Sequence, residues 1–332
     1  MTTQTAQSGD AEVLQAHLER TAVAVFGGSS PITRIERRRA EFSSSYNCDI
    51  LTVQLGVDQQ FKAFLKDFGF VHIPKEQVPQ RRERELRVYR DLLAGTNLGT
   101  AQYYGCVWDE TAERYWLLLE YVPGIEVRYA EFSYWIEAAR WLARMQGYFG
   151  AAARHAQLST GNYLIEHDAA FFRDKAAQAG RAVAVFPPVY STRLAPILHK
   201  HEQVVEMMAA QPRLLVHGHY RPQNILVSLD STPLRICPVD WEVAALGSPL
   251  YDLAFLSDGF AGPMLDQLCV AYEQEARCCG LPLPGRAEMQ YLLDCFGLHR
   301  MLTLLGKVAS EQFAESGVAK VLDRAEIFSS RL

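Results

Sequence analysis

The sequence predicts an α+β protein built from two dissimilar parts. Between residues 32 and 122, short runs of alternating apolar and polar residues are separated by turn-forming residues, which is typical of an antiparallel sheet. From residue 133 onward, apolar residues recur every three or four positions, as amphipathic helices require. A polar loop, residues 217–224, interrupts this second part and lies between two apolar runs of strand length.

Composition limits the classes of protein that fit. With 332 residues, 49% of them hydrophobic and 21% charged, the chain can form two domains or one bilobal domain with an ordinary core. A net charge of −5 argues against a surface that coats nucleic acid, although residues 37–39 and 81–82 are locally basic. We therefore expect no nucleic-acid partner.

Cysteine usage and hydropathy suggest a location. The seven cysteines are scattered and contain no CxxC pair, which predicts neither a disulfide framework nor a zinc site. Residues 1–10 lack a signal-peptide pattern, and no apolar run approaches the roughly 18 residues of a membrane span. We expect a cytoplasmic protein without a membrane partner.

The first part begins with a tail and a helix. Residues 1–10 are expected to be disordered. Residues 11–28 predict a helix that Gly27 and Gly28 end, with one apolar side formed by Val13, Leu14, Leu18 and Val25. The strand patterns that follow cover residues 32–42, 50–57 and 59–69, then a helix is predicted over 81–95, and two more strands flank a polar turn at 109–113.

The second part is mainly helical. The predicted helices cover residues 133–149, 196–212 and 285–308. The first should turn Ile136, Leu142, Met145 and Phe149 inward, and the second should do so with Ile197, Val204, Val205 and Met208. On the second helix His199 and His201 are two positions apart and point to different sides, which argues against a shared metal site.

The polar loop is interpreted as the active site, because nothing structural requires such polarity between two apolar strands. Its order His217-Gly218-x-x-Arg221-Pro222-x-Asn224, with Asp240 sixteen residues later, resembles the catalytic and metal-binding loops of aminoglycoside phosphotransferases, choline kinases and, more distantly, protein kinases. The family usually has Asp at the third position of this motif, where this chain has His219.

The resemblance spans residues 30–310 and implies a bilobal protein-kinase-like fold, with a small antiparallel sheet in the N-lobe and a larger, mainly helical C-lobe. It implies an N-terminal tail and helix at residues 1–28 and a nucleotide-binding N-lobe at 29–119. Residues 120–332 would form the hinge and the catalytic, substrate-binding C-lobe.

In the N-lobe the resemblance assigns residues to the nucleotide. Ser43, Ser44 and Ser45 could donate hydrogen bonds to phosphate oxygens, although serine-rich hairpin turns are common without such a role. Lys66 matches the phosphate-anchoring lysine, with Lys62 as the alternative.

Two further N-lobe assignments have structural alternatives. Glu85, or else Glu83, would hold the lysine, although either could be a surface glutamate. The backbone of Glu120, Tyr121 and Val122 would bind adenine as the hinge, or this stretch is only an edge strand before a turn.

The sequence Asp-Phe-Gly at 67–69 copies a kinase metal-binding motif but precedes the catalytic loop instead of following it. We interpret it as a coincidence and expect Asp67 to be an exposed turn residue.

In the C-lobe the resemblance assigns the chemistry. Asn224, Asp240 and Glu242 would supply the hard oxygen ligands that Mg²⁺ prefers. Arg221 would offset phosphate charge, and His219 could accept the proton of a substrate hydroxyl. Asp252 matches an aspartate that braces the catalytic loop.

Together these assignments imply a phosphotransferase that uses ATP or GTP with Mg²⁺ and moves the γ-phosphoryl group to a hydroxyl of a small metabolite or antibiotic-like compound. Its partners would be a nucleotide and this small molecule. The alternative is a degenerate kinase that binds nucleotide or a metabolite as a regulatory or accessory protein, or that has altered chemistry, since His219 cannot supply the charge of an aspartate.

Overall fold

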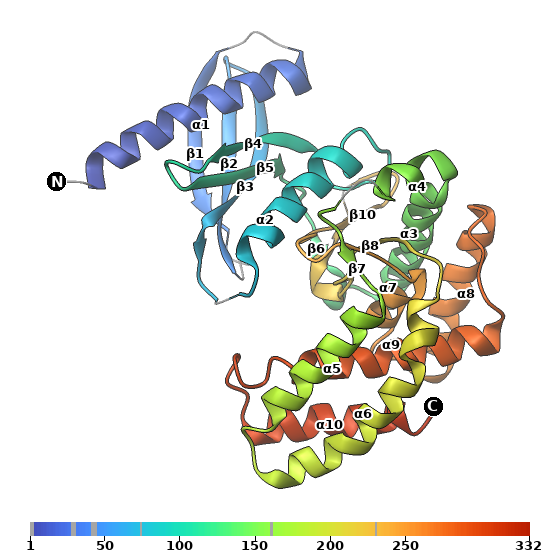
Figure 1. Ribbon diagram of the computed structural model, residues 1–332. Coiled ribbons are helices and arrows are strands. Elements are labelled where there is room, and N and C mark those ends of the chain that lie inside the picture. The colour runs from blue at the N-terminus through green and yellow to red at the C-terminus, as the bar shows by residue number, and fades with distance from the viewer. Residues whose placement is uncertain (1–2, 28–30, 41–44, 74, 160–161, 230) are drawn as a thin grey trace. The chain divides into compact units, whose positions relative to one another are not determined.

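A computed structural model describes residues 3–27, 31–40, 45–73, 75–159, 162–229 and 231–332 (Figure 1). The contacts of the chain divide it into two compact units, residues 1–124 and 125–332. The sequence placed this division between residues 119 and 120.

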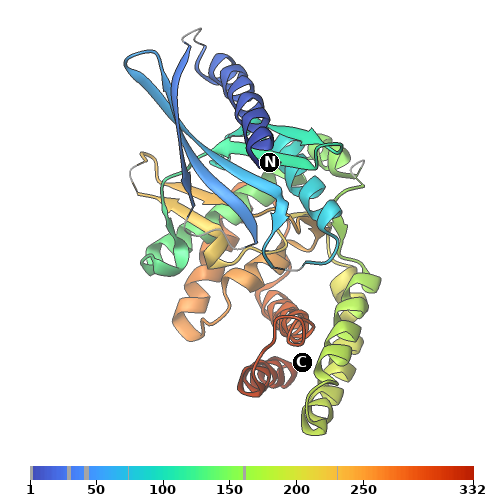
Figure 2. The same cartoon turned by 90° about the vertical axis from the view of Figure 1, so that its left-hand side faces the viewer.

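The first unit contains one antiparallel sheet of five strands in the order β1-β2-β3-β5-β4. Figure 2 shows its blue to green strands in a second view. Its strands are β1 (Ile32–Arg39), β2 (Tyr46–Leu55), β3 (Gln59–Val71), β4 (Tyr103–Asp109) and β5 (Arg114–Glu120). All four strand pairs are antiparallel, so the two predicted groups of strands join through β3 and β5 into one sheet. Alternate residues of β2 and β3 are buried, as the sequence pattern requires.

Helix α1 (Thr3–Phe26) packs on this sheet through Leu14, Leu18 and Ala22. The predicted disorder of residues 1–10 was wrong for residues 3–10, which are helical. Asp10 forms an ion pair with Arg114 of β5 at 2.5 Å, and this contact fastens the first turns to the sheet. Val25 was predicted to face inward but is 38% exposed, because the core contacts of α1 end near Ala22.

Helix α2 (Val78–Arg87) continues into a π-helical stretch, Val88–Leu93. The predicted apolar face is confirmed, since Leu86, Tyr89 and Leu93 are buried. Gly95 follows with a φ of +73°, a backbone conformation in which glycine avoids the steric cost of a Cβ.

The second unit is mainly helical, as predicted. Its helices are α3 (Phe132–Gly150), α4 (Ala152–Ser159), α5 (Ala169–Val183), α6 (Pro188–Ala209), α7 (Pro249–Leu256), α8 (Gly262–Cys278), α9 (Arg286–Leu305) and α10 (Glu315–Ser329). Two small sheets accompany them, in the orders β10-β9-β6 and β7-β11-β8. Their strands are β6 (Ile125–Glu126), β7 (Ile165–Glu166), β8 (Leu214–Val216), β9 (Ile225–Ser228), β10 (Arg235–Pro238) and β11 (Ala245–Gly247).

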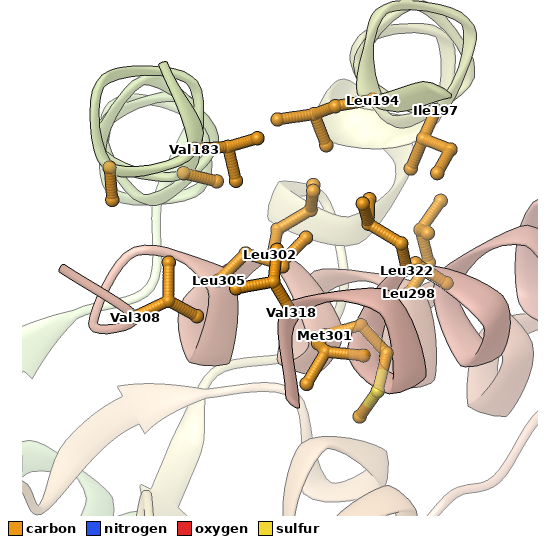
Figure 3. Packing of buried hydrophobic residues seen from close by; sticks show 14 residues of the cluster. Val183, Leu194, Ile197, Leu298, Met301, Leu302, Leu305, Val308, Val318 and Leu322 are labelled. Atoms are coloured by element: carbon orange, nitrogen blue, oxygen red, sulfur yellow. The ribbon is translucent and has the colours of Figure 1, made fainter. Parts of the chain in front are cut away.

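One apolar core of this unit lies among α5, α6, α9 and the C-terminal helix α10 (Figure 3). It buries Val183, Leu194, Ile197, Leu298, Met301, Leu302, Leu305, Val308, Val318 and Leu322. The inward face predicted for residues 196–212 is confirmed, because Ile197, Val204, Val205 and Met208 are all buried. Helix α6 nevertheless begins at Pro188, ahead of the predicted start, and Pro196 lies exposed inside it.

Most of the apolar face predicted for α3 is confirmed. Leu142, Met145 and Phe149 are buried, whereas Ile136 is partly exposed. Over the residues that the structure describes, no helix is both long and apolar enough to cross a membrane.

Candidate active site

The loop between β8 and β9 ends where the β9–β10 hairpin begins. In the antiparallel pair of β9 with β10, Ile225 lies opposite Pro238. The pairing continues one step further, since the N–H of Val239 donates to the carbonyl oxygen of Asn224 at 2.8 Å. Asp240 follows at once, so the hairpin brings Asn224 and Asp240 together although sixteen residues separate them in the chain.

Asp252 of α7 holds the start of this loop. Its carboxylate accepts hydrogen bonds from the N–H of His217 at 2.6 Å and the N–H of Gly218 at 3.0 Å. Gly218 has a φ of +75°, and a Cβ there would lie 2.2 Å from the carbonyl oxygen of Val243, so the position accepts only glycine. Burial raises the pKa of Asp252 to about 7, although these hydrogen bonds act to lower it.

His217 connects the loop to the hairpin. Its Nδ1 accepts from the N–H of His219 at 3.3 Å, and its Nε2 lies 3.0 Å from the carbonyl oxygen of Val239. One ring nitrogen therefore accepts and the other donates, which is the pattern of a neutral imidazole. Burial lowers the pKa of His217 to about 4, and its ring packs 4.4 Å from that of Trp241.

His219 is the third residue of the loop and was predicted to act on a substrate hydroxyl. Its carbonyl oxygen accepts from the N–H of Arg221 at 2.7 Å and from the side-chain amide of Asn224 at 3.0 Å. Its Nδ1 is buried and has no hydrogen-bond partner among the described residues. Burial holds the pKa of His219 well below its ordinary value, and the nearby charge of Arg221 lowers it further. The imidazole is therefore neutral at physiological pH.

The oxygen donors suit magnesium. Because the amide nitrogen of Asn224 donates to His219, its Oδ1 is left to accept or to ligate. Oxygens of the Asp240 and Glu242 carboxylates lie within 4.8 Å of each other. Asp240 has a φ of +69°, an uncommon conformation for a residue other than glycine, and such conformations concentrate at functional sites. Two carboxylates and an amide oxygen form a donor set that fits Mg²⁺.

Arg221 is a half-buried cation. Its Nε is buried without a hydrogen-bond partner among the described residues, and its guanidinium lies 5.9 Å from the ring centroid of Phe255. Burial, followed by the charge of Arg300, lowers the pKa of Arg221 to about 10. The side chain therefore keeps its charge at neutral pH.

In the first unit, the predicted ion pair is confirmed. The Nζ of Lys66 on β3 donates to both carboxylate oxygens of Glu85 on α2, at 2.8 and 2.7 Å. The alternatives do not take these places, because Lys62 is exposed and Glu83 pairs with Arg87 at 3.3 Å. What the pair does for a nucleotide stays a prediction.

The predicted serine turn is only partly within the described residues. Ser43 and Ser44 lie outside them. Ser45 is buried, and its carbonyl oxygen accepts from the N–H of His72 at 2.8 Å. A phosphate contact by these serines stays a prediction.

The predicted hinge uses part of its hydrogen-bonding capacity inside the first unit. The N–H of Glu120 donates to Gln102 at 2.8 Å, and that of Tyr121 donates to Lys62 at 3.3 Å. Val122 makes no backbone hydrogen bond to any residue in the described ranges. If these residues bind a base, the N–H and carbonyl oxygen of Val122 are available to do so.

The expectation for Asp67 was wrong. It lies in β3 and is buried, because the strand continues to Val71 beyond the predicted turn. Its carboxylate accepts from the N–H of Gly69 at 3.0 Å, and burial raises its pKa.

The comparisons with known proteins agree with this geometry. A family model described as the phosphotransferase enzyme family matches residues 50–292, which is well over half of the chain. The chain belongs to this phosphotransferase family. Among curated proteins, none matches the sequence significantly.

Solved structures share the fold of this family member at low identity. Aminoglycoside phosphotransferase APH(2″)-IIIa with GDP and kanamycin is 13% identical, with a TM-score of 0.61 over 95% of this chain and 99% of that one. APH(4)-Ia with ADP and hygromycin B is 16% identical, with a TM-score of 0.58 over 94% and 97%. A microcompartment-associated aminopropanol kinase is 15% identical, with a TM-score of 0.52 over 96% and 95%. The predicted α+β fold class is confirmed.

Proposed function

We propose that the protein transfers the γ-phosphoryl group of ATP or GTP to a hydroxyl group of a small molecule. The observation that carries the proposal is the β9–β10 hairpin, which brings Asn224, at the end of the loop that holds His219 and Arg221, next to the segment after β10 that holds the carboxylates of Asp240 and Glu242. The structural relatives support it, because their names include GDP or ADP complexes and phosphotransferase or kinase activity.

Each group has a role that suits phosphoryl transfer, a reaction that depends mainly on positioning and charge neutralisation. Lys66, held by Glu85, contacts the phosphates of the nucleotide. Asn224, Asp240 and Glu242 hold Mg²⁺, which when bound neutralises phosphate charge. Arg221 offers a guanidinium to the transferred group. His219, neutral and with an unpartnered Nδ1, accepts the proton of the acceptor hydroxyl.

A second candidate, a nucleotide-binding protein without transferase activity, rests on one specific observation. A neutral imidazole at position 219 cannot attract a metal or orient a hydroxyl as a carboxylate does. This candidate predicts that Mg²⁺-dependent nucleotide binding occurs without turnover of any acceptor.

Calorimetry with ATP and GTP, with and without Mg²⁺, tests the binding step. Incubation with ATP, Mg²⁺ and a metabolite extract, followed by mass spectrometry for products heavier by one phosphoryl group, tests the transfer. Absence of Mg²⁺-dependent nucleotide binding at millimolar concentration would contradict both candidates. Binding without a phosphorylated product would favour the second.

The role of His219 has its own test. Because burial holds the pKa of His219 well below its ordinary value, turnover should not fall in the pH range where an exposed imidazole is protonated, and it should fall only in more acidic solution. His219→Asp should change this acidic limb while keeping or raising the rate. If His219→Ala matches the wild type at every pH, then His219 is not the base.

A further inference from the structure

Three cationic or basic side chains surround the buried ring of Phe255 on α7. The ring centroid of His219 lies 6.0 Å from that of Phe255, and the guanidiniums of Arg221 and Arg300 lie 5.9 and 5.1 Å from it. Arg300 belongs to α9, far along the chain from the catalytic loop. Helix α9 thus brings a second guanidinium to the ring of Phe255, which His219 and Arg221 also approach.

This cluster has more cations than carboxylates. Arg300 and Arg324 both pair with the single carboxylate of Asp258. Arg221 forms no ion pair with any described residue. The groups that raise its pKa are the Tyr251 hydroxyl and two carboxylates, that of Glu311, which lies 4.0 Å from Lys307, and that of Asp240, which we assign to the metal.

A half-buried guanidinium without a carboxylate loses hydration that nothing in the described structure replaces. The proximity of Arg300 adds repulsion, and it is the second cause that lowers the pKa of Arg221. An anion from solution or from a substrate would remove both penalties, because guanidiniums bind carboxylate and phosphate groups with two parallel hydrogen bonds.

We propose that Arg221 and Arg300 form an anion-binding subsite, and that the acceptor molecule therefore carries a carboxylate or phosphate group in addition to the hydroxyl that is phosphorylated. This inference rests on the proposed function and names its substrate class. It separates the chain from relatives whose names specify aminoglycosides or aminopropanol, which carry amino groups.

Arg221 could also contact the phosphoryl group in transfer, so the test is made on Arg300. Arg300→Gln removes one guanidinium of the subsite and leaves Asp258 paired with Arg324, which protects the fold. Arg324→Gln is the matched control, because it removes the other partner of Asp258 and leaves the Phe255 cluster in place.

The full-length protein is saturated with ADP and Mg²⁺ so that the nucleotide phosphates do not compete, and inorganic phosphate, malonate and aminopropanol are titrated separately by calorimetry. We expect saturable binding of phosphate, malonate or both, which distinguishes the two anion classes, and no saturable binding of aminopropanol. Arg300→Gln should weaken anion binding at least about tenfold, as expected for loss of charge-assisted hydrogen bonds, and Arg324→Gln should not.

Two results would overturn the inference: no saturable anion binding to the wild type, or anion binding that Arg300→Gln leaves unchanged. Failure of the proposed function is recognised separately, because binding of ADP and Mg²⁺ is measured first in every variant. If ADP does not bind, the anion titrations are made without nucleotide and decide the subsite alone.

Discussion

Two buried carboxylates organise this molecule in different ways. Glu85 in the first unit faces a cation, Lys66, with both oxygens within 2.8 Å of its Nζ. Asp252 in the second unit faces the backbone N–H groups of His217 and Gly218. Both side chains are almost fully excluded from solvent, at 1% and 0% exposure, so burial alone does not distinguish them.

The different partners of the two carboxylates indicate different roles. An ion pair fixes the position of a charged side chain, here that of Lys66. It does not determine the shape of the backbone on either side. A carboxylate that binds consecutive N–H groups fixes the shape of the backbone itself. Removing Glu85 should therefore affect mainly chemistry, whereas removing Asp252 should affect both chemistry and folding.

Asp252→Ala should have the largest effect. It leaves the N–H groups of His217 and Gly218 buried without an acceptor, at a cost of about 3–5 kcal/mol in the free energy of unfolding. Urea denaturation measures this cost, and transferase activity should disappear with the loop geometry. Asp252→Asn retains one acceptor oxygen, so its free energy of unfolding should fall by roughly half as much. A loss below about 1 kcal/mol for Asp252→Ala would mean that water replaces the carboxylate and that it does not shape the loop.

Asp240→Asn should change the chemistry of the site without changing its fold. The side-chain volume hardly changes, and Asn tolerates the φ of +69° at this position, so the free energy of unfolding should stay within about 0.5 kcal/mol of the wild type. Phosphoryl transfer should be abolished, because the carboxylate that the proposed function assigns to Mg²⁺ is lost. Unaltered turnover in this variant would remove Asp240 from the mechanism.

Glu85→Gln tests the other side of the comparison. The amide still offers Lys66 a hydrogen bond but no counter-charge, so we expect kcat/KM to fall about 10–100-fold with a smaller relative change in stability than Asp252→Ala causes. Glu83→Gln on the same helix is the control, because Glu83 is exposed and pairs with Arg87. Equal activity of the two variants would show that Lys66 needs no partner.

Local sequence patterns predicted most of the strands and helices, and the motif resemblance predicted the site residues. The pairing of Lys66 with Glu85 followed from the resemblance to the kinase-like family, on a strand and a helix that the local patterns also predicted. The resemblance likewise assigned Asn224 and Asp240 to the metal, but the β9–β10 hairpin that brings them together was seen only in the structure. Asp67 was misjudged because nothing local shows how far β3 continues.

Residues that meet only through helix packing gave no such signal. Arg300 reaches Phe255 from α9, and no motif or spacing links it to Arg221. The same is true of three histidines, His167, His201 and His299, which lie far apart in the sequence and meet in the helical unit. Only tertiary contacts show that they are buried together.

These histidines supply the smallest effect that we predict. His201 and His299 lie 3.2 Å apart between Nε2 and Nδ1, and this contact requires at least one neutral ring. Burial lowers the pKa of His167 to about 3 and that of His201 to about 4, and it holds the pKa of His299 well below its ordinary value.

The sign of the pH dependence follows from these shifts. In the unfolded chain a histidine takes up a proton near pH 6.5, whereas in the folded chain His201 does so only near pH 4. Between these values the unfolded state binds more protons, so stability is retained above pH 6.5 and decreases as the pH falls toward 4. Asp252 acts in the opposite direction over this range, because its pKa is raised in the folded state to about 7.

Comparing His201→Gln with the wild type measures the contribution of His201 alone to the pH dependence of stability, because Asp252 and the other histidines are the same in both proteins. Going from pH 7 to pH 5, the wild type should lose about 1–2 kcal/mol more unfolding free energy than the variant. Urea denaturation at the two pH values measures the difference. His199→Gln, on the exposed side of the same helix, should keep the wild-type pH dependence. If His201→Gln also keeps the wild-type pH dependence of the unfolding free energy, then His201 is protonated as readily in the folded protein as in the unfolded chain. Burial of His201 would then not contribute to the loss of stability in acid.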